Sequence, residues 1–125
     1  MTEVKKNTDL TVGVAGLGAI GLQVAKALDS GSIPGLRLVG VCSRSIDKAR
    51  QNVASFKYPP EITDSENLAR MCDIIVECVP KAAFPGIARP ALQHGRTMIT
   101  ISGAAILANP EIVDEARRHG ARIIL

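Results

Sequence analysis

A chain of 125 residues is long enough for a single domain with a hydrophobic core. Hydrophobic residues make up 46% of the chain but aromatic residues only 2%, so the core must consist of Val, Ile, Leu and Ala, which favours a parallel sheet over an all-β sandwich. The net charge of +3 comes without a run of Lys and Arg, and no apolar run approaches a membrane span. We therefore expect neither nucleic acid nor a membrane as a partner.

The cysteines indicate the compartment. Cys42, Cys72 and Cys78 are an odd number and lack the spacing of metal ligands, so we expect reduced, buried thiols in a cytoplasmic protein, and no metal site. Residues 1–9 are polar and lack the apolar segment of a secretory signal, and we expect them to be flexible.

Strand-like apolar runs alternate with helix-like patterns along the whole chain. The predicted strands are Leu10–Ala15, Leu36–Cys42, Glu61–Thr63, Asp73–Val79, Thr97–Ile101 and Arg122–Leu125. The predicted helices are Ala19–Ser30, Ile46–Phe56, Ser65–Met71, Ala82–His94 and Pro110–His119.

Local signals mark several of these helix boundaries. Ser45 and Asp64 are predicted N-caps. Pro90 is expected to kink its helix, and Asn109 is expected to cap the last helix, which Gly120 ends.

The alternation of strands and helices predicts βαβ units with right-handed crossovers and a parallel sheet. It matches the α/β, doubly wound Rossmann fold with strand order 3-2-1-4-5-6. We predict one dinucleotide-binding domain over residues 1–125. The last strand stops at the end of the chain, which indicates either a domain cut from a longer protein or an ordinary edge strand.

A glycine-rich turn follows the first strand. Gly16, Gly18 and Gly21 form G-x-G-x-x-G between a strand and a helix, the context that gives this motif its meaning. We expect Gly16 to permit the turn, Gly18 to admit a pyrophosphate and Gly21 to let the helix pack closely. The N–H groups of Ala19 and Ile20 are then expected to face the phosphates.

The end of the second strand indicates the type of dinucleotide. An NAD site usually has an acidic residue there, whereas this chain has Ser43, Arg44 and Ser45. The hydroxyls can donate to a 2′-phosphate and the guanidinium can pair with it. We therefore predict that NADP or NAD is bound and that NADP is accepted, with a preference for NADP left open.

The fourth strand ends beside the expected switch point of the sheet. Cys78, Val79 and Pro80 follow it and are predicted to contact the cofactor, with Cys78 as a packing residue rather than a nucleophile. Glu77 lies in the most apolar strand, where a carboxylate is costly. It either reaches solvent or a backbone N–H, or acts near the nicotinamide or substrate.

The loop after the fifth strand lies at the same edge of the sheet. We predict that Ser102, Gly103 and Ala104 form a wall on the nicotinamide side, with an ordinary βα loop as the alternative.

Three segments together are similar to one family. Val14–Gly21, Asp73–Cys78 and Ile99–Ala104, followed by Gly120–Leu125, resemble the N-terminal NAD(P)-binding domain of the L-aspartate dehydrogenase family, which is related to homoserine dehydrogenase. The loop Ile101–Ala104 differs slightly from the usual loop of that family.

The resemblance implies an enzyme that oxidatively deaminates L-aspartate to iminosuccinate or oxaloacetate, with hydride transfer to NAD(P), as a homodimer that feeds NAD biosynthesis. It places the catalytic histidine and the contacts to the amino-acid substrate in a later domain. The catalytic residues are therefore expected beyond residue 125, and this chain alone is expected to bind cofactor without turnover. Two alternatives stay open: another dehydrogenase, acting on homoserine or a sugar, or a non-catalytic NAD(P)-sensing module.

Overall fold

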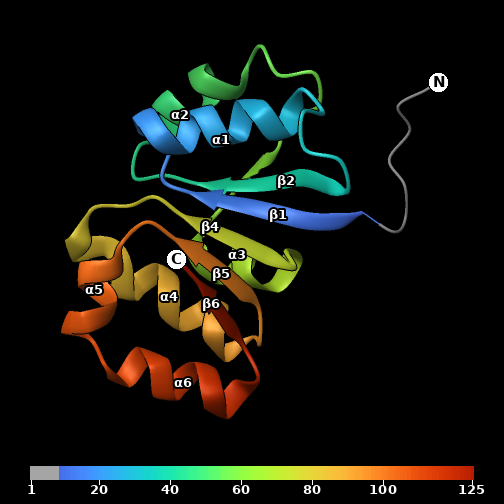
Figure 1. The fold of residues 1–125 in the computed structure, drawn as a ribbon. Coiled ribbons are helices and arrows are strands. Elements are labelled where there is room, and N and C mark those ends of the chain that lie inside the picture. Colours follow the sequence, from blue (N-terminus) through green and yellow to red (C-terminus); the bar gives the residue numbers. More distant parts are fainter. Residues whose placement is uncertain (1–8) are drawn as a thin grey trace.

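Six parallel strands form one sheet in the order β3-β2-β1-β4-β5-β6, as predicted. The computed structural model describes residues 9–125, so the flexible segment predicted at residues 1–9 lies outside the described residues except for Asp9. The first three strands extend the sheet from β1 to the β3 edge. The chain then crosses back, and β4, β5 and β6 extend the sheet on the other side of β1 (Figure 1). The crossover leaves a switch point between β1 and β4, at their carboxyl ends.

The strands are β1 (Leu10–Ala15), β2 (Leu36–Cys42), β3 (Glu61–Ile62), β4 (Ile74–Glu77), β5 (Thr97–Thr100) and β6 (Arg122–Ile124). The helices are α1 (Ala19–Asp29), α2 (Ile46–Val53), α3 (Ser65–Met71), α4 (Phe84–Gln93), α5 (Gly103–Ala108) and α6 (Glu111–His119). A short 3₁₀ turn, η1 (Lys81–Ala83), precedes α4.

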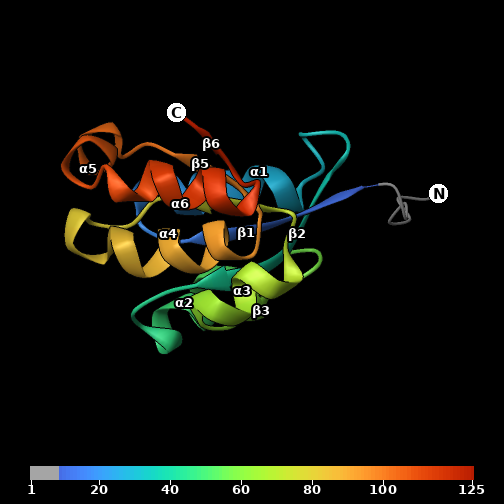
Figure 2. The same ribbon diagram turned by 90° about the horizontal axis from the view of Figure 1, so that it is seen from below.

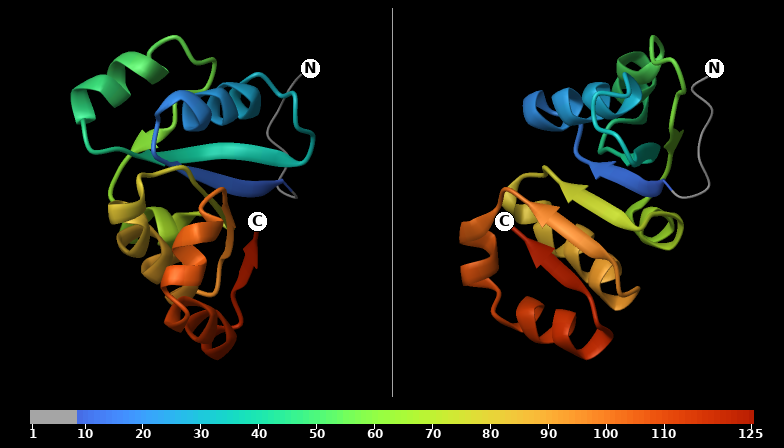
Figure 3. Two further views of the ribbon diagram at one scale, coloured as in Figure 1. Left: turned by 60° about the vertical axis from the view of Figure 1, so that its left-hand side comes forward. Right: turned by 45° about the vertical axis from the view of Figure 1, so that its right-hand side comes forward.

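Helices cover both faces of the sheet (Figures 2 and 3). On one face, α1 and α2 pack on β1 and β2 through a cluster that includes Val14, Leu28 and Val53. On the other face, α3 and α4 pack on β1 and β4 around Ile75. A third cluster joins α4, α5 and α6 to β5 around Met98. The core is mainly aliphatic, as the composition predicted, but it also contains Phe56, Phe84 and Met98, so the expectation of a core of Val, Ile, Leu and Ala alone is wrong. These layers hold the strand ends in place.

The predicted bounds are confirmed for β1, β2 and α3 and are too long elsewhere. Helix α2 ends at Val53 rather than at Phe56, whose N–H donates to the Val53 carbonyl in a turn. Strand β4 ends at Glu77 because the chain turns there towards η1. Helix α4 begins at Phe84, after the 3₁₀ turn, rather than at Ala82.

The predicted caps are mostly correct. The side chains of Ser45 and Asp64 accept hydrogen bonds from backbone N–H groups in the first turns of α2 and α3, and Gly120 ends α6 in the left-handed conformation. Asn109 was wrongly assigned as the N-cap of α6. Its amide donates to the carbonyl of Ala105, at 2.7 Å, and so caps the carboxyl end of the preceding helix instead.

Helix α5 is a correction, because no helix was expected between the fifth strand and Asn109. Gly103 and Ala104 belong to its first turn. Its buried Ala105 packs in the cluster of α4, β5 and α6, which supplies stability that six residues lack on their own. None of the helices found between residues 9 and 125 has the length and apolar character that crossing a membrane requires.

Candidate dinucleotide-binding site

The glycine turn between β1 and α1 is built on close backbone contacts. Gly16 has φ +94° and its N–H donates to the carbonyl of Cys42 at 2.8 Å. A Cβ on Gly16 would stand 2.5 Å from the carbonyl oxygen of Cys78. A Cβ on Gly21 would stand 1.7 Å from the carbonyl oxygen of Gly16. These two glycines therefore let the turn lie against β4 and the helix lie against the turn.

Gly18 is different because a Cβ at this position would meet nothing within 4 Å. Gly18 is exposed and is the N-cap of α1, and no side chain caps the helix there. The open space faces the N-terminus of an eleven-residue helix, where the positive end of the helix dipole favours an anion. This space is what a pyrophosphate requires.

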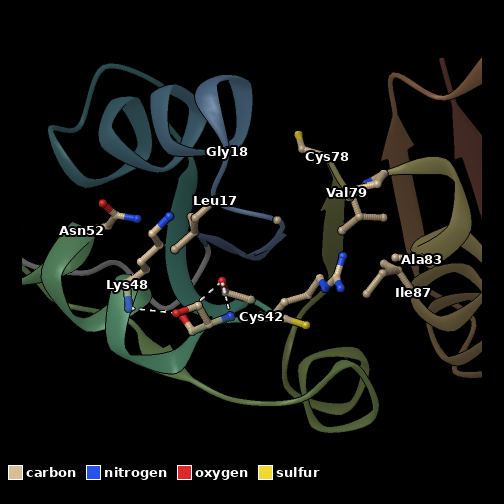
Figure 4. A pocket seen from close by; sticks show the side chains of 14 residues that line it. Leu17, Gly18, Cys42, Lys48, Asn52, Cys78, Val79, Ala83 and Ile87 are labelled. Carbon is tan, nitrogen blue, oxygen red and sulfur yellow. Dashed lines mark hydrogen bonds between the residues drawn. The ribbon is translucent and has the colours of Figure 1, made fainter.

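A pocket of about 560 Å³ opens beside this turn (Figure 4). Its volume lies in the range of small-molecule and cofactor sites. Its lining comes from the glycine turn, from α2 and the residues before it, from the ends of β2 and β4, and from η1 and α4. The lining residues are Gly16, Leu17, Gly18, Cys42, Ser43, Arg44, Ser45, Lys48, Asn52, Cys78, Val79, Pro80, Ala83 and Ile87.

The structure brings most of the predicted site residues together. Those that line the pocket are Gly16, Gly18, Ser43, Arg44, Ser45, Cys78, Val79 and Pro80. Those outside its lining are Ala19, Ile20, Gly21, Ser102, Gly103 and Ala104.

Sequence reasoning missed two polar residues of the pocket, Lys48 and Asn52. Both lie on α2 and face the loop that carries Leu17 and Gly18 (Figure 4). Their spacing of four residues places them on one face of the helix, directly after the Ser45 cap. This spacing was the signal available in the sequence.

The end of the pocket near α2 is basic and rich in hydroxyls. The Ser45 hydroxyl accepts from the N–H of Lys48 at 3.3 Å, and the Ser43 hydroxyl accepts from the N–H of Ser45 at 3.3 Å. Arg44 and Lys48 are exposed, and no carboxylate in residues 9–125 lies within ion-pair distance of either. The fourteen lining residues include no Asp or Glu. This end of the pocket therefore favours an anionic group.

Two thiols line the pocket, that of Cys42 at the end of β2 and that of Cys78 directly after β4. Burial raises the pKa of Cys42 and Cys78, and the charges of Asp64 and Glu77, respectively, raise them further. A raised pKa keeps a thiol protonated and poorly nucleophilic. The prediction that Cys78 is not a nucleophile agrees with this direction, although Cys78 is half-buried at the pocket rather than fully buried in the core.

Comparison with known families identifies this pocket-bearing domain. The family described as "Homoserine dehydrogenase, NAD binding domain" matches residues 16–125, which is most of the chain. The chain belongs to this family. A nicotinamide dinucleotide is therefore the class of cofactor expected in the pocket, as the turn and helix N-terminus indicate.

Two relatives named L-aspartate dehydrogenase are similar to this chain over all or most of its length. An L-aspartate dehydrogenase of Bradyrhizobium diazoefficiens is 36% identical over 125 residues, which are 100% of this chain and 44% of that protein. L-aspartate dehydrogenase 3 of Bordetella bronchiseptica is 36% identical over 117 residues, which are 94% of this chain and 43% of that protein. The chain thus spans less than half the length of these relatives.

Solved structures show the same fold. A homoserine dehydrogenase from Thiobacillus denitrificans has a TM-score of 0.77 at 21% identity, over 94% of this chain and 29% of that chain. A biliverdin reductase from Synechocystis, in complex with biliverdin and NADP+, has a TM-score of 0.75 at 18% identity, over 92% and 37% of the two chains. At these identities the likeness establishes the Rossmann fold of the family.

Proposed function

We propose that this chain is the dinucleotide-binding domain of an NAD(P)-dependent L-aspartate dehydrogenase. The observation that carries the proposal is the similarity, at 36% identity across the entire chain, to an enzyme of that name. The pocket supports it because the open face of Gly18 and the N-terminus of α1 suit a pyrophosphate. When bound, a nicotinamide supplies the acceptor for a substrate hydride.

We propose that the glycine turn holds the pyrophosphate and that the end of β2 selects the adenosine ribose. Gly16, Gly18 and the N–H groups of Ala19 and Ile20 are the pyrophosphate residues of this proposal, and Gly21 acts by packing the helix against the turn. Cys78, Val79 and Pro80 form the wall on the β4 side. Ser102, Gly103 and Ala104, at the end of β5, lie next along the sheet.

We further propose that NADP is accepted at the end of the pocket near α2. Arg44 and Lys48 supply positive charge, and Ser43 and Ser45 supply hydroxyls, with no carboxylate in the lining to repel a 2′-phosphate. Calorimetric titration of the chain with NADP+ and with NAD+ tests both proposals. Binding of neither dinucleotide contradicts the assigned function, and clearly tighter binding of NAD+ contradicts the role given to Arg44 and Lys48.

We propose that the groups which act on the amino-acid substrate lie outside these 125 residues, because the relatives are more than twice as long. A protein that extends over the length of those relatives should reduce NAD(P)+ in the presence of L-aspartate, measured by the absorbance of the reduced nicotinamide. The 125-residue chain should bind dinucleotide without this turnover.

The family name favours a second candidate substrate, L-homoserine. The same assay with L-homoserine in place of L-aspartate separates the two enzymes, and turnover of L-homoserine alone would overturn the first proposal. We also propose that the protein is a homodimer and that it is cytoplasmic. Light scattering on the eluting protein measures its mass, and microscopy of a tagged protein its compartment.

A further inference from the structure

Glu77 is a fully buried carboxylate at the carboxyl end of β4, with an exposed fraction of 0%. One carboxylate oxygen accepts a hydrogen bond from the hydroxyl of Thr100. The other accepts from the N–H of Val79 at 2.8 Å and from the hydroxyl of Ser102 at 3.2 Å. Of the expectations from the sequence, contact with a backbone N–H is thus confirmed and contact with solvent is not.

The partners of Glu77 belong to two different loops. Val79 follows β4, whereas Ser102 follows β5, and Thr100 is the residue paired with Glu77 across the two strands. The N–H of Ser102 also donates to the Thr100 hydroxyl, at 2.8 Å. The chain beyond β4 and the chain beyond β5 are therefore joined through a single buried side chain.

The Ser102 side chain binds Glu77 instead of capping α5. Ser102 is the N-cap residue of α5, yet its side chain makes no capping hydrogen bond and contacts Glu77 instead. In residues 9–125 no cationic side chain lies within ion-pair distance of Glu77, so hydroxyl and backbone donors alone satisfy the carboxylate. A buried carboxyl group needs such donors, because burial without them is costly.

The loop after β4 borders the pocket, and the loop after β5 lies next to it along the sheet, outside the pocket lining. Val79 and Pro80 line the pocket directly, while the basic end formed by Arg44 and Lys48 lies on the other side of the glycine turn. The order β2-β1-β4-β5 in the sheet keeps these two sides apart. If the adenosine ribose occupies the basic end, the loops joined by Glu77 lie beside the nicotinamide half.

We propose that Glu77 is a positioning residue: its carboxylate fixes the loop after β4 to the loop after β5 and thereby shapes the nicotinamide side of the dinucleotide pocket. The second half of this statement rests on the proposed function, whereas the joining of the two loops does not. Glu77 acts through Val79 and Ser102 and need not touch the cofactor.

The test removes the Thr100 hydroxyl, because Thr100→Val keeps the side-chain shape while deleting one donor to Glu77 and the acceptor of the Ser102 N–H. Thr100→Ser restores the hydroxyl. Thr97→Val at the opposite end of β5 is the matched control, since the Thr97 hydroxyl makes no hydrogen bond within the described residues. Glu77→Gln keeps the size of the side chain and replaces one of its acceptors by a donor.

The first measurement is amide hydrogen exchange on the chain without dinucleotide. We expect the amides of both Val79 and Ser102 to exchange about tenfold faster in Thr100→Val and in Glu77→Gln, with wild-type rates in Thr100→Ser and Thr97→Val. Val79 is decisive because it lies in the other loop and no hydrogen bond joins it to Thr100. Unchanged exchange of Val79 would overturn the joining of the loops.

The second measurement compares NAD+ with ADP-ribose, which lacks only the nicotinamide ring, by calorimetry. We expect Thr100→Val to weaken NAD+ about tenfold and ADP-ribose less than about twofold, a tenfold change in Kd being 1.4 kcal/mol. Equal weakening of both ligands would overturn the nicotinamide-side role. If wild type binds neither ligand, the proposed function fails, and the nicotinamide-side role fails with it, while hydrogen exchange still decides whether Glu77 joins the loops.

Discussion

The carbonyl oxygen of Gly16 lies where a side chain on Gly21 would begin: a Cβ on Gly21 would be 1.7 Å from it. This contact brings the first turn of α1 against the turn that follows β1. It explains why the motif needs its third glycine even though Gly21 does not line the pocket.

Two substitutions should separate packing from ligand approach. Gly21→Ala has no room against a backbone oxygen and should destabilise the chain by about 3 kcal/mol, measured by urea unfolding. Gly18→Ala meets no protein atom within 4 Å and should change stability by less than about 1 kcal/mol. Its methyl group should nevertheless weaken dinucleotide binding at least about tenfold. Unchanged binding by Gly18→Ala would contradict a pyrophosphate at this position.

The basic end of the pocket should control the choice between NADP and NAD. Arg44→Ala and Lys48→Ala should each weaken NADP+ about tenfold and NAD+ less than about twofold, because charge-assisted hydrogen bonds to the 2′-phosphate are lost. Arg50→Ala is the matched control. Arg50 lies on α2 with Lys48, but it is outside the pocket and pairs with Asp47 at 3.9 Å. Added salt should weaken NADP+ binding more than NAD+ binding. Equal losses for both cofactors would place the 2′-phosphate elsewhere.

Asp73 should make the stability of the chain depend on acid pH. A hydrogen bond from the Thr11 N–H to its carboxylate, at 2.9 Å, is the main cause that holds the pKa of Asp73 below its ordinary value of 3.8. A carboxyl with a lowered pKa in the folded state contributes stability above its unfolded value, and this contribution disappears as the pH falls through the folded value. The free energy of unfolding should therefore fall more steeply below pH 3.8 in wild type than in Asp73→Asn. Urea unfolding at a series of pH values measures both slopes.

A second variant checks the cause of this pH dependence. Thr11→Val removes the side-chain donor at 3.0 Å but keeps the backbone donor. Its slope should lie between those of wild type and Asp73→Asn. Identical slopes in all three proteins would show that Asp73 does not carry the effect.

The three thiols should differ in their reaction with iodoacetamide. Cys72 is buried, and burial is the main cause that raises its pKa to about 12, so we expect no labelling in the folded chain. Cys42 and Cys78 are half-buried at the pocket and should be labelled, but more slowly than a free cysteine, since burial raises their pKa as well.

Bound dinucleotide should protect both pocket thiols, and peptide mass spectrometry measures each site. Cys72 provides the internal control, because it lies outside the pocket. Labelling of Cys78 that dinucleotide does not slow would contradict a cofactor in contact with the β4 side of the pocket.

Local signals predicted much of this molecule. The structure confirms the strands predicted from the apolar runs Leu10–Ala15 and Leu36–Cys42, and the N-caps Ser45 and Asp64. These signals depend only on residues close together in the sequence. The glycine turn was predictable for the same reason. Helix α5 was missed because its first turn has no side-chain cap and its support comes from packing against α4 and β5.

The sequence by itself thus determined the alternation of elements, the strand order and the glycine motif, since periodicity, caps and turns depend on residues a few positions apart. Only the tertiary structure decided that Lys48 and Asn52 line the pocket. It likewise decided that Glu77 is bound by Thr100 and Ser102, residues 23 and 25 positions away. Such contacts depend on the register of neighbouring strands and on the path of the loops that follow them, and no local pattern carries that information.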